Sequence, residues 1–197
     1  MENSIIVFDT ETTGLPDWKS PSEAEHQPHL VQLAAHQVNT VTRQITQSMD
    51  VIIKPDGWEI PAETTEVHGI TTEYAHDVGV PEKLALEMFL ALWGGRTQVC
   101  HNTTFDRRII RIGTKRYFAE DVQDAWHGCD YECTMIQSRK IIGGKNPTLG
   151  EAYQFFTGQE MEGAHTAIGD VNACLAVYRA LQLFDDQAYA APNPATA

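Results

Sequence analysis

The stretch Ser-Ile-Ile-Val-Phe-Asp-Thr-Glu-Thr-Thr-Gly, residues 4–14, joins a short apolar run to two acidic side chains. The run predicts a strand over residues 4–9 that is buried on both faces. Asp9 and Glu11 are two residues apart, so their carboxylates point to the same side of that strand. Carboxylates in apolar surroundings are costly unless a cation shares the site. The segment therefore predicts a site for a divalent cation, and an exposed acidic pair at a strand edge is the alternative.

Two later segments add acidic side chains and a histidine. Asp106 lies in HNTTFDRR, and His165 and Asp170 lie in HTAIGDVNA. Taken alone, Asp106 would be a helix cap or a helix-dipole contact, and Asp170 would be an ordinary acid on a helix surface. His165 lies five residues before Asp170, a separation that does not align two side chains on a straight helix, which predicts that His165 lies on the loop or first turn before the final helix. Together with the first segment, these residues suggest a metal site for phosphoryl chemistry.

The length and the ends of the chain limit its class. With 197 residues, one domain with a single core is expected. No apolar stretch approaches the roughly 20 residues that span a bilayer, and no signal peptide is visible. We therefore expect a cytoplasmic protein with no membrane partner.

The net charge of −13 argues against a protein that holds long nucleic acids on a broad basic face. An enzyme that grips a few nucleotides through metals and hydrogen bonds remains compatible with it. One local basic cluster follows Asp106, and it is either a solvated helix face or a phosphate-steering surface. Its members are Arg107, Arg108, Arg111, Lys115 and Arg116.

The cysteines are expected to be free thiols, because no secretory signal accompanies them. They are Cys100, Cys129, Cys133 and Cys174. The group His127, Cys129 and Cys133 fits no common zinc spacing and has no evident fourth ligand. Packing or surface roles are preferred for it.

Strands come first along the chain and helices follow, interrupted by short strands, which predicts an α/β layered domain with a mixed sheet. A polar loop is expected over residues 17–28, and a tight turn at Asn39-Thr40. The expected strands are 4–9, 30–38, 41–53 and 97–100, and the main expected helices are 81–92, 103–112, 134–142, 149–156 and 167–183. Residues 1–183 are expected to form the domain, and residues 184–197 a flexible C-terminal tail.

Three motifs, in this order, resemble the DEDDh branch of the DnaQ-like exonuclease superfamily. They are Asp9-Thr10-Glu11-Thr12-Thr13-Gly14-Leu15, His101-Asn102-Thr103-Thr104-Phe105-Asp106 and His165-Thr166-Ala167-Ile168-Gly169-Asp170. Residues 60–71 also resemble the family's segment between the first two motifs, so the resemblance covers residues 4–183. One such motif would be weak evidence, but three at suitable spacing are specific.

The resemblance implies a ribonuclease-H-like fold, with a mixed β-sheet flanked by helices, and 3′→5′ exonuclease activity on DNA or RNA that releases nucleoside 5′-monophosphates. It implies two Mg²⁺ or Mn²⁺ ions, with a general base that takes a proton from the attacking water. The implied metal ligands are Asp9, Glu11, Asp106 and Asp170, and the implied base is His165.

The resemblance also implies contacts with the terminal nucleotide. Thr12 and Leu15 belong to the loop expected to touch it, and Asn102 and Phe105 are candidates for the pocket wall. Core packing is the alternative for Phe105, and His68 is expected to be structural. Cys133 departs from the family, since relatives often have aspartate there, and the polar 17–28 loop is an insertion that could alter substrate access.

Several functions stay open at this point. The main one is a stand-alone exonuclease on single-stranded DNA or RNA; the variants are a proofreading subunit of a DNA polymerase and an RNA-trimming exoribonuclease. A catalytically silent binding module and a phosphodiesterase of small nucleotides are further alternatives. The implied partners are a nucleic acid with a free 3′ end and, for the proofreading variant, a polymerase or other replication protein.

Overall fold

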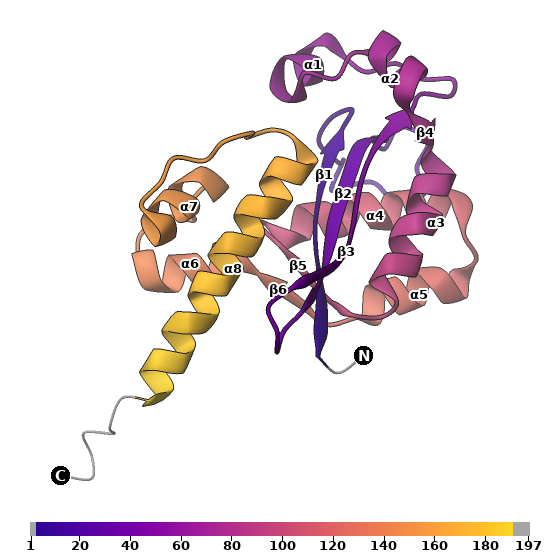
Figure 1. Ribbon diagram of the computed structural model, residues 1–197. Helices are drawn as coiled ribbons and strands as arrows, with labels where there is room; N and C mark the ends of the chain where they lie inside the picture. The colour runs from indigo at the N-terminus through magenta and orange to yellow at the C-terminus, as the bar shows by residue number, and fades with distance from the viewer. Residues whose placement is uncertain (1–2, 191–197) are drawn as a thin grey trace, which may run out of the picture.

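A mixed six-stranded sheet organises the computed structural model, which describes residues 3–190, with side chains described as far as Leu183. The central strand β1 (Ser4–Thr12) pairs antiparallel with β2 (Leu30–Asn39) and parallel with β5 (Thr97–Cys100). The sheet continues through β3 (Ile45–Lys54) to β4 (Val80–Pro81) on one side and to β6 (Tyr131–Cys133) on the other. The strand order is β4-β3-β2-β1-β5-β6 (Figure 1), so the predicted mixed α/β sheet is confirmed.

Helices cover both faces of this sheet (Figure 1). In the described part of the chain they are α1 (Ala62–His68), α2 (Thr72–Val78), α3 (Glu82–Trp93), α4 (Thr103–Tyr117), α5 (Glu120–Gly128), α6 (Thr134–Ile142), α7 (Leu149–Thr157) and α8 (Ala167–Ala190). One core cluster joins β1 to α3 and α4 through Ile6 and Phe8, and a second joins β1 to α8 through Ile5 and Val7. The strand is therefore buried on both faces, as its sequence predicts.

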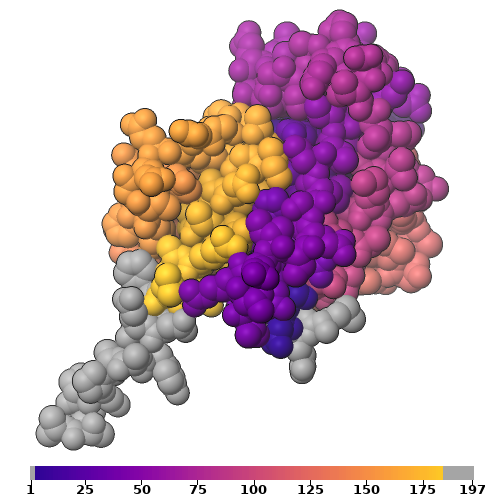
Figure 2. Space-filling model, in the orientation of Figure 1, coloured from indigo at the N-terminus to yellow at the C-terminus, as the bar shows by residue number. Residues whose placement is uncertain are grey.

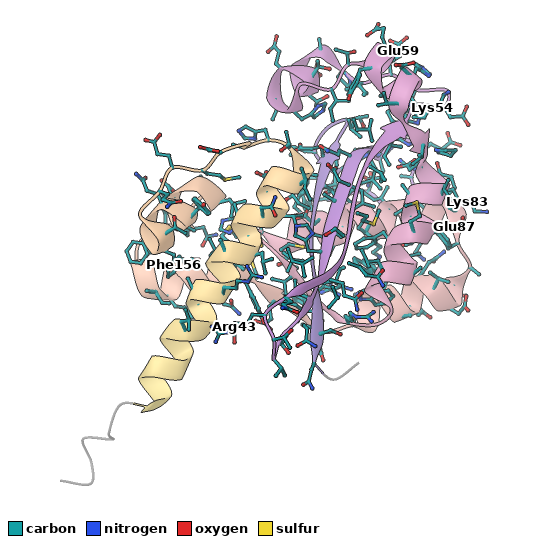
Figure 3. The ribbon with its side chains drawn as sticks, in the orientation of Figure 1. Arg43, Lys54, Glu59, Lys83, Glu87 and Phe156 are labelled. Atoms are coloured by element: carbon teal, nitrogen blue, oxygen red, sulfur yellow. The ribbon has the colours of Figure 1, made fainter. Side chains whose placement is uncertain are left out.

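The helical layers on the two faces of the sheet differ in what they contact on their outer side. Helix α3 presents Lys83 and Glu87 to solvent one turn apart, with Nζ and Oε1 separated by 3.8 Å (Figure 3). An exposed pair of this kind adds well under about 1 kcal/mol. On the opposite layer, the β2–β3 hairpin lies against α8 (Figure 2), where an Nη of Arg179 donates to the carbonyl of Arg43 at 2.6 Å. No helix within residues 3–190 combines the length and apolar character needed to cross a membrane.

Several boundaries differ from the sequence prediction. The predicted tight turn at Asn39-Thr40 is wrong: β3 begins only at Ile45, because the Asn39 side chain accepts hydrogen bonds from the amides of Val41 and Thr42 and closes a longer loop. Helix α8 continues to Ala190 instead of ending near Leu183. The rest of the predicted tail, residues 191–197, lies outside the described residues. The short elements α2, β4, α5 and β6 were not predicted, since they give little periodic signal.

The loop over residues 17–28 is built around the side chain of Gln27, which is 2% exposed. Its Oε1 accepts from the amide of Asp17 at 3.1 Å, and its Nε2 donates to the carbonyls of Asp17 and Pro21 at 2.9 and 3.0 Å. Arg108 and Arg116 of α4 donate to the carbonyls of Ser20 and Pro28, which fastens the loop to that helix. The loop is therefore an ordered part of the domain.

We expect Gln27→Ala to lower the free energy of unfolding by roughly 1–3 kcal/mol, because it removes a buried side chain and leaves the amide of Asp17 and the carbonyls of Asp17 and Pro21 without their partner. Thermal unfolding measures this loss, and limited proteolysis should locate new cleavage within residues 17–28. Gln47→Ala is the matched control, since Gln47 is exposed on β3. Equal stability of the two variants would contradict the buried role of Gln27.

Candidate metal centre

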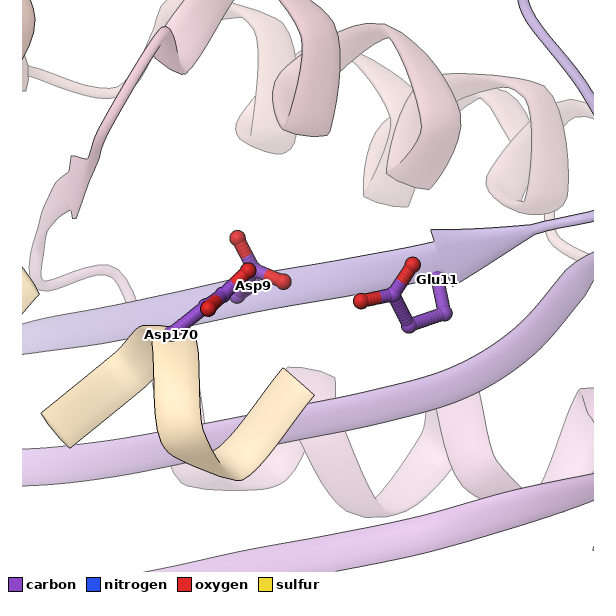
Figure 4. A group of neighbouring side chains, drawn as sticks. All are labelled: Asp9, Glu11 and Asp170. Atoms are coloured by element: carbon purple, nitrogen blue, oxygen red, sulfur yellow. The ribbon is translucent and has the colours of Figure 1, made fainter. Parts of the chain in front are cut away.

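Three carboxylates meet where β1 passes the beginning of α8 (Figure 4). One oxygen from each of Asp9, Glu11 and Asp170 lies within 4.8 Å of the other two. Asp9 and Glu11 share the face of β1 on which Val7 packs against Val171 of α8. That contact places the first turn of α8, with Asp170, next to the acidic end of the strand.

Gln32 of β2 fixes the start of α8 over the sheet. Its Oε1 accepts from the amide of Ala167 at 3.1 Å, and its Nε2 donates to Asp50 of β3 at 2.7 Å. Gln32 is also the cross-strand partner of Glu11. Sequence reasoning missed Gln32 and Asp50, because a polar residue within a strand does not reveal which helix terminus it will meet.

Asp106 lies in the first turn of α4, as predicted, but it is not one of the three carboxylates that meet within 4.8 Å. It is 2% exposed, and its Oδ1 accepts from the amide and the hydroxyl of Thr10 at 3.1 and 2.9 Å. Thr10 stands between Asp9 and Glu11 in sequence and faces the opposite side of β1. Asp106 is thus tied to the residue between the two acids, and its carboxylate repels that of Asp9.

Burial raises the pKa of all four carboxyl groups. For Asp9 the pKa is raised well above its ordinary range by burial and then by repulsion from Asp106, Asp170 and Glu11. Burial, followed by repulsion from Asp170, raises the pKa of Glu11 to about 7. Burial raises the pKa of Asp106 to about 8, although the hydrogen bonds from Thr10 lower it in part. Burial also raises the pKa of Asp170, and the nearby His165 lowers it in part. The cluster is short of positive charge.

The donor set fits a divalent cation. Its atoms are carboxylate oxygens, which hard cations such as Mg²⁺ and Mn²⁺ prefer. The Oδ1 atom of Asp170 is buried and has no hydrogen-bond partner in the structure, so it is left with an unused acceptor beside two other acids. A bound cation would satisfy this oxygen and offset the repulsion that raises the pKa values.

Because the carboxyl groups of this cluster have higher pKa values in the folded chain than in the unfolded chain, the free energy of unfolding depends on pH and on bound metal. The ordinary pKa values of 4.5 for Glu11 and 3.8 for Asp106 are raised to about 7 and about 8 in the folded chain. Their contribution to stability is therefore fully present below about pH 4 and is lost as the pH rises through about 7 and 8. We expect the Tm in EDTA to fall between about pH 5 and about pH 8, and Mg²⁺ or Mn²⁺ to raise the Tm more at the higher pH.

Thermal unfolding across this pH range, with EDTA or metal, measures both effects. In Glu11→Gln the fall of Tm with pH should be shallower and the metal-induced rise smaller. Identical curves for the variant and the unmodified protein, with and without metal, would show that Glu11 takes no part in this linkage.

His165 lies on the segment between α7 and α8, as predicted, and its side chain is exposed. Its φ of 64° is a left-handed conformation that few non-glycine residues adopt. Together with Asp170 it lines a hollow of about 470 Å³, whose other walls include Leu149 and Gln154 of α7 and Met161. The histidine is thus open to solvent beside the carboxylates, with room for a ligand.

The candidate substrate contacts occupy different environments. Leu15 is 83% exposed, whereas Thr12 is 7% exposed and its hydroxyl donates to the carbonyl of Gly14 at 2.8 Å. Asn102 is exposed and has a left-handed φ of 67° at the start of α4. Phe105 is half-buried and packs against the core, so both alternatives for its ring remain open.

The remaining histidines and cysteines near the site have structural contacts. The Nδ1 of buried His68 accepts from the amide of Ile70, and His101 bridges the Thr134 hydroxyl and the Pro147 carbonyl at 3.0 Å each. All four cysteines are free, as predicted. Cys133 of β6 lies beside Cys100 of β5 as its neighbour in the sheet. In the described residues, the only group of three or more His, Cys, Asp or Glu side chains arranged for a metal is the carboxylate cluster, so the zinc alternative finds no support.

Comparison with known proteins adds the family. The chain matches the family model described as Exonuclease over residues 6–178. It is 27% identical over 146 residues to the DNA polymerase III subunit epsilon of Buchnera aphidicola, with 74% of this chain and 59% of that protein covered. It is 29% identical over 177 residues to a DNA polymerase III subunit epsilon-like protein of Rhodobacter capsulatus, with 86% of this chain and 22% of that protein covered. The chain thus spans only part of the length of these relatives.

Solved structures confirm the fold. E. coli Exonuclease I in complex with a dT13 oligonucleotide superposes with a TM-score of 0.74 at 19% identity, over 95% of this chain and 42% of that one. The zinc-bound form of the same enzyme with single-stranded DNA gives a TM-score of 0.74 at 19% identity, over 94% of this chain and 42% of that one. The predicted ribonuclease-H-like architecture is therefore confirmed.

Proposed function

This chain belongs to the exonuclease family, and we propose that it is a metal-dependent 3′→5′ exonuclease that hydrolyses single-stranded DNA to nucleoside 5′-monophosphates. The observation that carries the proposal is the meeting of Asp9, Glu11 and Asp170 beside an exposed His165. A silent binding module would have no need to retain an acidic cluster that raises its own pKa values.

Asp9, Glu11 and Asp170 would hold the cations directly, and Asp106 would contribute directly or through water. Two Mg²⁺ or Mn²⁺ ions would lower the pKa of a bound water and offset charge at the scissile phosphate. Thr10 holds Asp106 through two hydrogen bonds, and Gln32 holds the helix that carries Asp170. These contacts fix the carboxylates before substrate arrives, which reduces the reorganisation that the reaction requires.

His165 would act as the general base. Its imidazole would take one proton from the attacking water, and the oxygen would form a bond to phosphorus as the bond to the 3′ oxygen breaks. The hollow beside His165 offers space for the terminal nucleotide. Leu15 and Asn102, both exposed, would contact that nucleotide, and Thr12 would shape the turn that presents Leu15. Phe105 would form part of the pocket wall.

DNA is the preferred substrate in this proposal, because the matched relatives are DNA polymerase III proteins and the two structures compared above hold a dT13 oligonucleotide and single-stranded DNA. The same relatives favour a second candidate, a proofreading subunit that acts with a polymerase. In either case the catalytic domain would include the whole of α8, as far as Ala190, and would act in the cytoplasm.

The test uses 5′-labelled single-stranded DNA and RNA with Mg²⁺ or Mn²⁺, and parallel reactions in EDTA. We expect a ladder that shortens from the 3′ end on DNA, is slower on RNA and is absent in EDTA. A strand with a blocked 3′ end is the control for endonuclease action. Cleavage of neither strand with either metal would refute the enzyme proposal, and faster cleavage of RNA would favour the RNA-trimming alternative.

A further inference from the structure

Five of the 14 Lys and Arg residues lie between residues 107 and 116, in a chain whose net charge is −13. Three of the five, Arg107, Arg108 and Arg111, line one hollow of about 200 Å³ between α4, α5 and β6. Thr104, Trp126, His127 and Tyr131 complete its lining. We call this site the arginine hollow.

The positive charge of the arginine hollow is not neutralised by acidic side chains. Arg107 donates to the carbonyls of Trp126, His127 and Cys129, and its guanidinium lies 3.9 Å from the centre of the Tyr131 ring. Arg108 donates to the carbonyls of Asp17 and Ser20, and its Nε is buried without a partner. Among residues 3–183, whose side chains the structure describes, no carboxylate forms an ion pair with any of the three arginines.

Arg116, also on α4, differs from these three arginines because it forms an ion pair. Its Nη1 lies 3.6 Å from Oε1 of Glu82, so its charge is paired within the fold. Arg107 and Arg108 are held by neutral carbonyls, and the guanidinium of Arg111 forms no hydrogen bond or ion pair with the side chains and backbone that the structure describes. Rigid, unneutralised guanidinium groups are typical of sites that recognise phosphate.

The arginine hollow and the carboxylates lie on opposite sides of α4. The spacing of Thr104, Arg107, Arg108 and Arg111 puts them on one face of α4, opposite the face from which Asp106 reaches Thr10. A helix is roughly 10–12 Å across, so a strand that begins at the carboxylates must run several nucleotides to reach the hollow. At about 200 Å³ the hollow is smaller than the roughly 300 Å³ at which ligand pockets begin, which suits a phosphate group better than a whole nucleotide.

We infer that the arginine hollow binds the phosphodiester backbone of the nucleic-acid strand, several nucleotides before its 3′ end. This inference rests on the proposed function, because it takes the strand in the active site as its ligand. The contact gives an acidic protein a local grip on a polyanion without a broad basic face. It also predicts that affinity depends on strand length.

The test compares Arg111→Gln with Lys140→Gln, which removes an equal charge from an exposed position on α6. Arg111 is the residue to change because its guanidinium, unlike those of Arg107 and Arg108, donates no hydrogen bond to the described part of the fold. For a DNA strand of about 12 nucleotides, Arg111→Gln should raise KM about fivefold at about 0.1 M salt and leave kcat unchanged. This follows from the loss of one phosphate contact, which lowers the salt slope of a single strand by about 0.7.

A strand of about three nucleotides should show no change in KM, because it cannot reach the hollow, and Arg111→Lys should restore most of the affinity for the longer strand. Lys140→Gln should alter neither strand. Equal changes for both lengths, or an unchanged salt slope for the longer one, would overturn the inference, as would an effect of Lys140→Gln equal to that of Arg111→Gln.

Fluorescence anisotropy of the longer labelled strand in EDTA separates this inference from the proposed function, since binding needs no catalysis. A salt slope that falls in Arg111→Gln supports the hollow even if no strand is cleaved. No binding, or binding that is indifferent to Arg111, overturns the inference even if the short strand is hydrolysed.

Discussion

Asp9→Asn is expected to lower kcat by about 10³-fold or more while making the metal-free protein more stable at about pH 8. Burial raises the pKa of Asp9, and repulsion from Asp106, Asp170 and Glu11 raises it further. An amide of the same shape is a poor ligand for a divalent cation, so the metal's contribution to the reaction is lost. The same amide has no charge to bury, so folding no longer bears that cost.

Steady-state kinetics with Mg²⁺ or Mn²⁺ and thermal unfolding in EDTA measure the two effects together. Asp124→Asn is the matched control, since Asp124 is exposed on α5; it should change neither rate nor Tm. A loss of activity accompanied by a lower Tm in EDTA would point to misfolding and would contradict the role assigned to Asp9.

His165→Ala is expected to lower kcat by about 10²–10⁴-fold, the usual contribution of a general base, with a much smaller change in KM. The metal-induced rise in Tm should persist, because the three carboxylates that meet at the site do not include this residue. Single-turnover rates and unfolding with metal report the two properties separately.

His76→Ala is the control for this variant, because His76 is an exposed histidine on α2, remote in sequence from the three motifs. If His165→Ala lost the metal-induced rise in Tm, the histidine would serve the metal site and not the attacking water. If kcat stayed within about twofold, the assignment of the base would be wrong.

The main layers of the fold were predictable because they rest on strong local patterns. The apolar run before Asp9 is buried on both faces, and the helices that carry Asp106 and Asp170 begin where their sequences indicate. The turn after Asn39 was not predictable, because a side-chain acceptor replaced the expected tight turn. Short elements such as β6 depend on pairing with β5, which no local pattern encodes.

The carboxylates of the candidate site could be predicted from the sequence, but the hydrogen bonds that hold them in place could not. The motifs identify Asp9, Glu11 and Asp170, which the fold brings together. The spacing of the motifs does not predict the two hydrogen bonds that Thr10 donates to Asp106. Gln32 likewise acts through a helix that is 135 residues away in sequence. Long-range polar contacts of this kind depend on the assembled sheet.

The alternation along β1 has a consequence for folding accuracy. Ile6, Phe8 and Thr10 face one layer of helices, whereas Val7, Asp9 and Glu11 face the other. A slip of β1 by one residue would exchange the two faces and bury both acids among Phe89 and its apolar neighbours. Because unpaired buried carboxylates are so costly, the misaligned chain would be strongly disfavoured. The acids that weaken the metal-free domain thus also help to ensure that its central strand is correctly aligned.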